Sequence, residues 1–263
     1  MMQNIQIFEI LPLWVIYLGT VFLILGAIRS GIAFARHRVK RLGKEEDAPI
    51  NTVVGATLGL LAFILAFTFG MTTSRFDAKK HFLLDEVTAI ETTWYRAGLI
   101  PEPNQTEVRD LLVSYVNLRI QLADKKIDIK EAIKQSDQIQ HQLWDHTIAL
   151  AEMDLKNGSV VTLFTNSVNQ LINIQTKRIS VALIDRIPAL IWIALFTLII
   201  LAMFEVGFLF GKMQKINWPL LLALSMAFSA VILIIVDLDT AKGTINVNQQ
   251  LMFDLYERIL HNT

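Results

Sequence analysis

A row of three bulky apolar residues, Phe63, Phe67 and Met71, recurs at four-residue intervals in a stretch that is otherwise small and apolar. On a helix with 3.6 residues per turn, residues at this interval lie on one face. Such a row can narrow a water-filled path and exclude the water that an ion carries, which is how hydrophobic gates in channels work. A helix face that meets lipid or a protein core shows the same pattern. The row therefore indicates a candidate pore constriction, with ordinary packing as the alternative.

Charged residues follow this row within two turns. Arg75, Asp77 and Lys79 come directly after Met71, and Arg75 and Lys79 share a helix face because they are four residues apart. If that face lines a pore mouth, it attracts anions; the alternative is a collar of side chains that reach the membrane surface. The stretch FILAFTFGMTTSRFDAKKHFLLDE, from Phe63 to Glu86, has no proline or turn pair. Because Gly70 alone weakens a helix by only about 1 kcal/mol, one continuous helix is predicted to leave the bilayer here.

Small residues form a second pattern in the same segment. Gly55 and Gly59 are four residues apart, as are Ala62, Ala66 and Gly70. Small residues at this spacing allow membrane helices to approach closely, since packing rather than a hydrophobic drive holds helices together in lipid. The pattern predicts helix packing, either within the chain or between several copies whose second spans surround a shared axis.

Acidic residues are rare in the apolar runs. Glu205 is the ionisable residue inside the third run, and intramembrane carboxylates are costly and usually functional or paired. We expect Glu205 either to face a pore, where its carboxylate would oppose the passage of anions, or to reach the membrane surface or pair with a basic residue of the nearby loop. Asp237 and Asp239 end the fourth run and are interpreted as a polar stop.

Enzyme chemistry is not indicated. The 5 histidines have no metal-binding spacing, and there is no cysteine. Phosphate-binding glycine loops, serine–histidine–acid sets and paired catalytic acids are also lacking. We therefore expect no catalytic residue, no metal and no cofactor, and the formal net charge of +0 gives no reason to expect nucleic acid as a partner.

The elements that position these residues are membrane-spanning helices. The chain is 53% hydrophobic with a mean hydropathy of +0.46, which is high for a soluble domain. Its apolar runs long enough to cross a bilayer, which takes about 20 residues, are Leu11–Ile28, Val53–Met71, Ile187–Phe210 and Trp218–Val236. We expect an all-α integral membrane protein of four transmembrane helices, since soluble cores rarely contain such runs.

The chain divides into four parts on this basis. We expect a first pair of spans with a basic loop in residues 1–71, an extramembrane helical bundle in 72–186, a second pair of spans in 187–236 and an amphipathic tail in 237–263. The bundle is predicted to contain extensions of the second and third spans, the latter running to Pro188. Its other signals are a capping box at Asn104 with Glu107, a helix start at Asp128, and a helix end at Gly158 followed by a cap at Ser159. Leu251, Leu255 and Ile259 are predicted to form the apolar face of the tail helix.

Loop charges predict the orientation. The loop between the first two spans contains the basic residues Arg29, Arg36, Arg38, Lys40, Arg41 and Lys44, whereas no Lys or Arg precedes the first span. By the positive-inside rule, the short loops face the cytoplasm of a bacterial inner membrane. The termini and the helical bundle are then extracytoplasmic.

The end of the second span and the residues after it resemble the bacterial bestrophin-like family. The similar stretch is LLAFILAFTFGMTTSRFDAKKHFLLDEVTAIETTWYRAGLIPEP, followed by VRDLLVSYVNLRI. The family pattern of Arg–aromatic–Asp, a later Glu and an aromatic–Arg–Ala group is matched by Arg75, Phe76, Asp77, Glu86, Tyr95, Arg96 and Ala97. Asp239 and Gly243 are matched to the Asp and Gly of the family's Asp-x-Pro-Phe-x-Gly segment, although the interval here is one residue shorter, Ala241 and Lys242 depart from the pattern and the proline is missing.

This resemblance implies a function. Bestrophins proper are pentameric anion channels whose second span lines an apolar neck, and that neck maps here onto Phe63, Phe67 and Met71. The resemblance implies a homo-oligomeric, pentameric channel for small inorganic anions. The alternative is a non-conducting membrane sensor or scaffold whose helical bundle binds a ligand or a partner protein.

Overall fold

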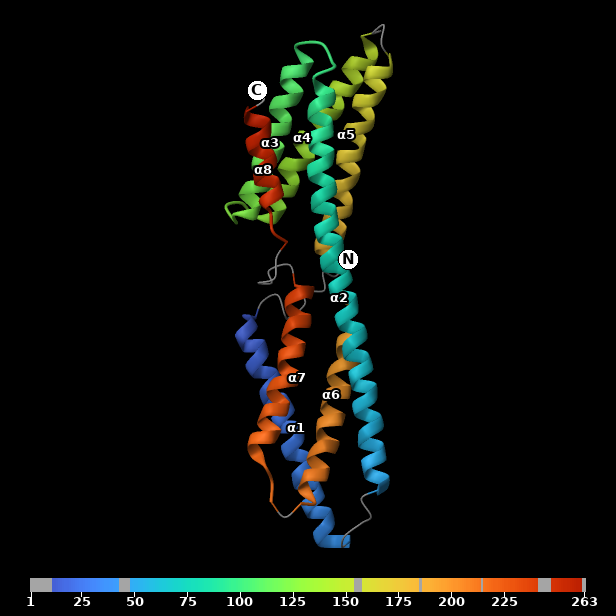
Figure 1. The fold of residues 1–263 in the computed structure, drawn as a ribbon, viewed down its shortest axis with the longest axis vertical. Coiled ribbons are helices and arrows are strands. Elements are labelled where there is room, and N and C mark those ends of the chain that lie inside the picture. The colour runs from blue at the N-terminus through green and yellow to red at the C-terminus, as the bar shows by residue number, and fades with distance from the viewer. Residues whose placement is uncertain are drawn as a thin grey trace. The chain divides into compact units, whose positions relative to one another are not determined.

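The structure is a computed structural model that describes residues 11–42, 48–153, 158–184, 186–213, 215–240 and 247–261. Within these ranges all regular secondary structure is helical (Figure 1). The chain divides into two compact units. The first comprises Met1–Phe76 and Arg186–Asn246, and the second Asp77–Asp185 and Val247–Thr263.

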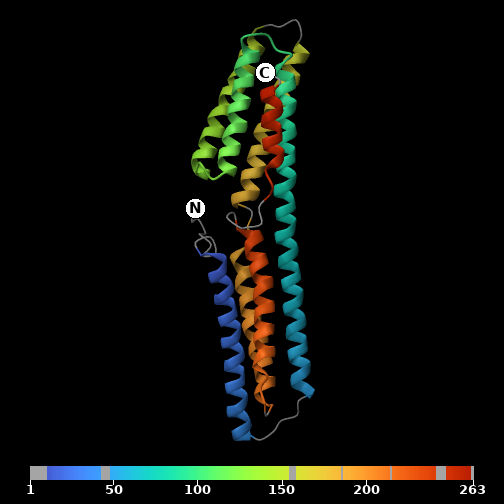
Figure 2. The same ribbon diagram turned by 60° about the vertical axis from the view of Figure 1, so that its left-hand side comes forward.

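The first unit is built from the four apolar helices. They are α1 (Leu13–Leu42), the first part of α2 (Ala48–Ala97), α6 (Ala189–Gly211) and α7 (Trp218–Asp239). Each is long and apolar enough to span a membrane, so the four predicted spans are confirmed as helices. Helix α1 packs against both α6 and α7 (Figures 1 and 2). Their shared core includes Ile24 and Ile28 of α1, Leu195 and Ile199 of α6 and Ile235 of α7.

Helices α1 and α6 approach at backbone contact. A Cβ atom placed on Gly31 would lie 2.0 Å from the carbonyl oxygen of Phe204, and one on Gly207 would lie 2.1 Å from that of Ile28. At Gly211 the same atom would lie 2.8 Å from the carbonyl oxygen of Ile32. Small-residue packing of membrane helices therefore occurs in this chain between the first and third spans.

Helix α1 is longer than the sequence predicted. The first span was expected to end at Ile28, but the helix continues to Leu42. Its basic residues from Arg29 to Arg41 are thus helical rather than part of a loop. The extension contains no proline, and the residues Ile32 and Ala35 are buried within it, so packing stabilises these added turns. Lys44 lies outside the described residues.

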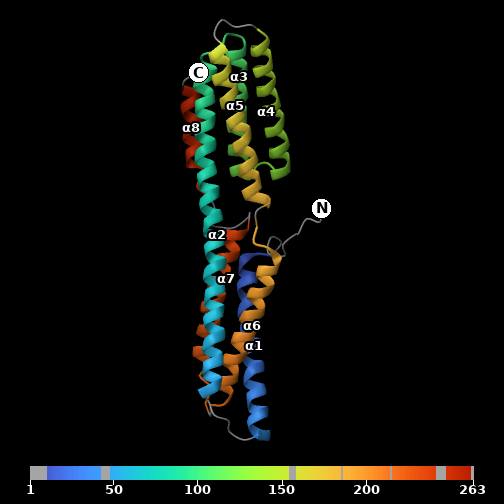
Figure 3. The same cartoon turned by 90° about the vertical axis from the view of Figure 1, so that its right-hand side faces the viewer.

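The second unit is a helical bundle. It contains the second part of α2, α3 (Asn104–Ala123), α4 (Ile129–Glu152), α5 (Gly158–Ile179), the π-helical segment η2 (Ser180–Ile184) and α8 (Gln250–His261). Helix α3 packs against α4 and α8, and α4 packs against α5. Figures 2 and 3 show α8 beside the second part of α2. The core joins residues of these helices, including Leu83, Leu112, Leu143, Leu171 and Leu255.

Helix starts in the bundle follow the sequence in part. Asp128 caps α4 as predicted, since its side chain accepts a hydrogen bond from the backbone N–H of Lys130 at 3.1 Å. Asn104 does not cap α3, because it is the first helical residue and its Oδ1 lies 2.8 Å from His146 Nδ1. Glu102 instead accepts from the backbone N–H of Thr106 at 3.2 Å. The carboxylate two residues earlier takes the role predicted for the amide.

Three other sequence predictions are corrected by the helix ends. Gly158 is the first residue of α5 rather than the end of α4, so Ser159 is helical too. The third span is not continuous with α5, because residues 186–188 are non-helical and α6 starts after Pro188. In α8 the buried residues are Met252, Leu255 and Ile259, while Leu251 is exposed. Leu251 lies beside the buried face rather than on it, because Met252, Leu255 and Ile259 form that face at intervals of three and four residues.

Candidate functional site

Helix α2 turns one face toward its own unit and leaves the opposite face open. Val54, Leu61, Leu65, Thr68 and Thr72 are buried, and their spacing of seven, four, three and four residues defines a single face. The predicted constriction lies elsewhere on the helix. Phe63 is 65% exposed and Phe67 55% exposed, whereas Met71 is half-buried. The two phenylalanines therefore point away from the core of their own chain.

The small residues of α2 share this open side. Gly55, Gly59, Ala62, Ala66 and Gly70 are all exposed. A Cβ atom placed on any of the three glycines would have no atom within 4 Å. Packing within the chain, one of the two predicted roles for this pattern, is thus not seen among the residues described. The stripe is available to lipid or to another copy of the chain.

The open face continues along α2 beyond the apolar segment. Ser74, Asp77, His81, Asp85 and Thr88 follow Gly70 at intervals of three or four residues, and all five are exposed. Because this spacing keeps residues on one side of a helix, the face that carries the phenylalanines becomes polar and acidic. Asp77, one of the three predicted mouth residues, lies on it.

Arg75 lies on the other side of the helix. Its guanidinium donates a hydrogen bond from Nη1 to Oδ1 of Asp239 at the end of α7, and the two side chains are only 13% and 1% exposed. The same carboxylate oxygen accepts from the backbone N–H of Ile187 at 3.3 Å. Asp239 is therefore more than the polar stop expected from sequence, and Asp237 is buried as well. The positive charge of Arg75 is matched within its own unit.

Lys79, the third predicted mouth residue, is half-buried. It is one helical turn beyond Arg75 and so lies on the same side of α2. The structure thus separates the three residues: Arg75 and Lys79 lie on the inner side of α2, and Asp77 lies on the open face.

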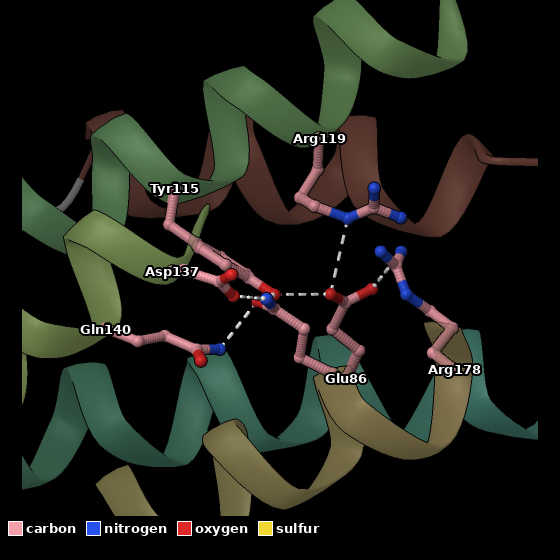
Figure 4. Close-up of polar contacts among 7 residues, drawn as sticks. Glu86, Tyr115, Arg119, Asp137, Gln140 and Arg178 are labelled. Carbon is pink, nitrogen blue, oxygen red and sulfur yellow. Dashed lines mark hydrogen bonds and ion pairs between the residues drawn. The ribbon is translucent and has the colours of Figure 1, made fainter. Parts of the chain in front are cut away.

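Glu86 is the centre of a buried polar cluster in the second unit (Figure 4). Its carboxylate has no solvent exposure. Tyr115 donates its hydroxyl proton to Oε1 at 2.7 Å, and Arg178 donates from Nη1 to Oε2 at 2.8 Å. Arg119 completes the set, with Nε 3.3 Å from Oε1. One carboxylate on α2 thus binds side chains from α3 and α5.

Two glutamines extend the cluster to α4. Gln140 donates to Gln175 Oε1 at 2.6 Å, and Gln175 donates to Asp137 Oδ1 at 2.9 Å. The Tyr115 hydroxyl also lies 3.0 Å from Gln175 Oε1. Burial, reinforced by the negative charge of Glu86, raises the pKa of Tyr115 well above 10.0. Tyr115 therefore remains a proton donor, and the cluster joins four helices through one buried network, although the Nε atoms of Arg119 and Arg178 have no hydrogen-bond partner among the described residues.

Of these residues, sequence reasoning identified only Glu86, through the family resemblance. Tyr115 and Arg119 are four residues apart in the apolar face of α3, and an arginine on an apolar face indicates a buried partner. Arg96, another motif residue, donates from Nη1 to the backbone oxygen of Leu163 at 2.7 Å, so it joins α2 to α5. Gly243 lies outside the described residues.

Glu205 lies in α6 and lines a pocket that Arg38 also lines. Its nearest basic neighbour along the helix, Lys212, instead stands over the ring of Phe208 at 5.5 Å. Among the described residues, no group of three or more His, Asp or Glu side chains could hold a metal ion.

These features define an all-helical membrane protein with four apolar helices and a helical unit outside the apolar segments. The model of the bestrophin-like domain matches residues 22–250, and the chain belongs to the bestrophin-like family. Residues 22–250 include α2 in full, together with Glu86, Arg96 and Asp239.

Solved structures share the fold. Two crystal structures of point variants of a bacterial bestrophin homologue from Klebsiella pneumoniae are similar, one with a TM-score of 0.64 at 17% identity and the other with 0.65 at 16%. They cover 95% and 94% of this chain, and 98% and 97% of their own chains. A crystal structure described as that of a membrane protein gives a TM-score of 0.66 at 17% identity, covering 95% of this chain and 97% of its own. A comparison with curated proteins finds no match.

Proposed function

We propose that the chain forms a homo-oligomeric ion channel of a bacterial inner membrane, with a pore lined by α2. The observation that supports this most is the open face of α2, where Phe63 and Phe67 are exposed beside a stripe of small residues that is also exposed, and where a Cβ atom on its glycines would meet no atom of the described residues within 4 Å. Copies arranged around an axis would bring these phenylalanines together as an apolar constriction. Family membership supports the same function, and the resemblance to bestrophins proper suggests five copies.

The experiment measures ion flux through the purified protein in liposomes. Phe67→Ala removes a bulky side chain from the proposed constriction and should raise flux several-fold, because a wider path is easier to hydrate. Phe69→Ala is the matched control. Phe69 is also exposed, at 44%, but it lies two residues away and so about 200° around the helix. Its replacement should leave flux unchanged.

Two results would count against this assignment. The first is that the protein conducts no ion, and the second is that both alanine variants behave alike. A stoichiometry measurement separates the channel from the sensor alternative, because a monomer or dimer cannot surround an axis with second spans. The polar cluster around Glu86 gives no specific support to the sensor alternative, since three side chains already bind the Glu86 carboxylate.

The charges on the open face bear on the permeant ion. Anions were expected from Arg75 and Lys79, but Arg75 is paired with Asp239, so that support is lost. Asp77 and Asp85 are exposed charges that follow the constriction on its own face, while the exposed Lys80 lies at the edge of this face, five turns beyond Ala62. We therefore propose cations as the better candidate for the permeant ion, with the anions implied by the resemblance as the alternative.

Reversal potentials across a salt gradient test this choice. Wild-type protein should give a cation-selective potential that Asp77→Asn shifts toward the anion side, because a ring of carboxylates concentrates cations at a pore mouth. Asp110→Asn, on α3, is the control and should shift nothing. An anion-selective wild type would contradict the cation assignment while leaving the channel itself intact.

A further inference from the structure

A second site lies in the first unit, away from the open face of α2. A pocket of about 340 Å³ is formed where the last turns of α1, the start of α2 and the end of α6 meet. Its size is at the lower end of the range for small-molecule sites. The pocket is lined by Phe34, Arg38, Ile50, Val53, Val54, Phe204, Glu205 and Phe208.

Glu205 gives this pocket a negative side. Its Oε2 atom is shielded from solvent and has no hydrogen-bond donor among the residues that the structure describes. A carboxylate oxygen left in this state within a membrane segment is costly. A ligand with N–H groups and a positive charge would satisfy it.

Aromatic rings beside Glu205 favour the same kind of group. The ring centroid of Phe34 lies 5.9 Å from that of Phe204 and 6.1 Å from that of Phe208. The faces of aromatic rings attract cations, and this attraction is strongest where water is excluded. Three rings and a carboxylate in one pocket form a site for an ammonium group.

Arg38 contributes a positive charge to the same pocket. A guanidinium presents several N–H donors in one plane, a geometry suited to phosphate oxygens. The pocket thus combines a carboxylate with a guanidinium, and apolar side chains of α2 form the remaining wall. This end of the spans also holds the basic residues of α1, and lipid headgroups lie at such membrane surfaces.

We propose that this pocket binds the headgroup of an aminophospholipid, with its primary ammonium on Glu205 and its phosphate on Arg38. Phosphatidylethanolamine has both groups, separated by two carbon atoms. Phosphatidylcholine has no N–H to donate to Glu205, and phosphatidylglycerol has no ammonium. The proposal does not depend on ion conduction, because the two residues that would hold the headgroup, Glu205 on α6 and Arg38 on α1, are not part of the open face of α2 that carries Phe63 and Phe67.

Native mass spectrometry of the full-length, delipidated protein tests the site. Phosphatidylethanolamine, phosphatidylcholine and phosphatidylglycerol with identical acyl chains are added in turn, and the bound fraction is measured for each. We expect phosphatidylethanolamine to bind at least about tenfold more tightly than phosphatidylcholine, as one charge-assisted hydrogen-bond set would give. Equal binding of these two lipids would overturn the proposal.

Variants assign the contacts. Glu205→Gln should abolish the preference for phosphatidylethanolamine over phosphatidylcholine, and Arg38→Gln should weaken phosphatidylethanolamine and phosphatidylglycerol alike. Lys215→Gln, an exposed residue of the neighbouring loop, is the matched control and should change neither. Val53→Trp keeps both charges but fills the pocket from α2, so it should exclude the lipid even if Glu205→Gln folds poorly. A preference that survives both Glu205→Gln and Val53→Trp would disprove the site.

A soluble competitor separates a lipid from a small ligand of the same chemistry. Phosphoethanolamine has the headgroup without the acyl chains and should displace the lipid only weakly. If it binds as tightly as the whole lipid, the site belongs to a soluble zwitterion and the lipid assignment is wrong.

Discussion

Glu86 organises the second unit from a single position. Its two oxygens accept from Tyr115 and Arg178, and Arg119 lies beside them, so helices α2, α3 and α5 meet at one carboxylate. Two buried guanidinium groups depend on its negative charge. Losing that charge would leave them uncompensated, which usually costs more than the loss of the ion pair itself.

Glu86→Gln should therefore lower the stability of the bundle by about 3 kcal/mol. The amide keeps the shape of the side chain but removes the charge that the two arginines face. Thermal unfolding of the purified protein, followed by circular dichroism, measures the effect as a lower Tm.

Glu91→Gln is the matched control for this variant. Glu91 is also on α2, but its ion pair with Arg258 is 3.6 Å long and its side chain is 31% exposed. Such a pair contributes less than about 1 kcal/mol, so the Tm should hardly move. Equal losses in the two variants would show that the Glu86 cluster is not a special source of stability.

The ionisation of Tyr115 should limit the stability of the same unit at alkaline pH. Burial and the charge of Glu86 raise its pKa in the folded protein well above its ordinary value of 10.0. The folded state then holds this proton more tightly than the unfolded state, so stability is intact below pH 10.0 and falls as the pH rises above it.

Tyr115→Phe should reduce the loss of stability at alkaline pH. The variant lacks the hydrogen bond to Glu86 and so melts at a lower temperature near neutral pH. Its Tm should then fall less steeply than that of the wild type between about pH 10 and 11, because no buried hydroxyl is left to titrate. If the Tm of the two proteins fell equally with rising pH, Tyr115 would not be the cause of the loss of stability at alkaline pH.

At the level of helices, the crossing of α1 and α6 depends on glycine. A methyl group at Gly31 would meet the backbone of Phe204, which cannot move aside as a flexible side chain can. Gly31→Ala should therefore separate the two helices and lower the Tm. Gly19→Ala, on the same helix, meets no atom within 4 Å and should be neutral or slightly stabilising, since alanine favours helix. Similar melting curves for both variants would contradict the close packing.

The spans were predictable because each depends on local composition. About 20 apolar residues in a row are enough to identify a membrane helix. The lack of proline or a turn pair between Phe63 and Glu86 predicted that α2 is continuous, and the helix extends from Ala48 to Ala97. The extension of α1 was missed because its charged residues resemble a loop. The extension is stabilised by the packing of Ile32 and Ala35 against other helices, and the sequence of one helix does not show which residues it will pack against.

The site was predictable only where its signal lies within one helix. The spacing of Phe63 and Phe67 placed them on a common face, and the structure leaves that face open. The inward turn of Arg75 was not predictable, because it depends on Asp239 at a position 164 residues away. The Glu86 cluster was missed for the same reason, since Arg178 lies 92 residues from Glu86 in sequence.

At the level of the whole molecule, orientation can be tested directly. Loop charges favour an extracytoplasmic C-terminus by the positive-inside rule, whereas the helical domain of bestrophins proper is cytosolic. A reporter that is active on one side of the membrane, fused after Thr263, distinguishes the two. Activity on the cytoplasmic side would overturn the loop-charge prediction and agree with the resemblance.

Because α2 is one unbroken helix, the direction of each of its side chains around the helix axis depends on the number of residues before it. Each residue advances a helix by about 100°, so inserting one alanine after Thr73 would turn the Glu86 side of the helix by that angle relative to Phe67. Either the cluster or the open face would then point in the wrong direction. Seven inserted residues restore the direction to within about 20°, so their insertion should disturb assembly and ion flux less than a single alanine does. A variant with a longer α2 must therefore gain residues in sets of seven, because the direction of the side chains around the helix axis has to be kept.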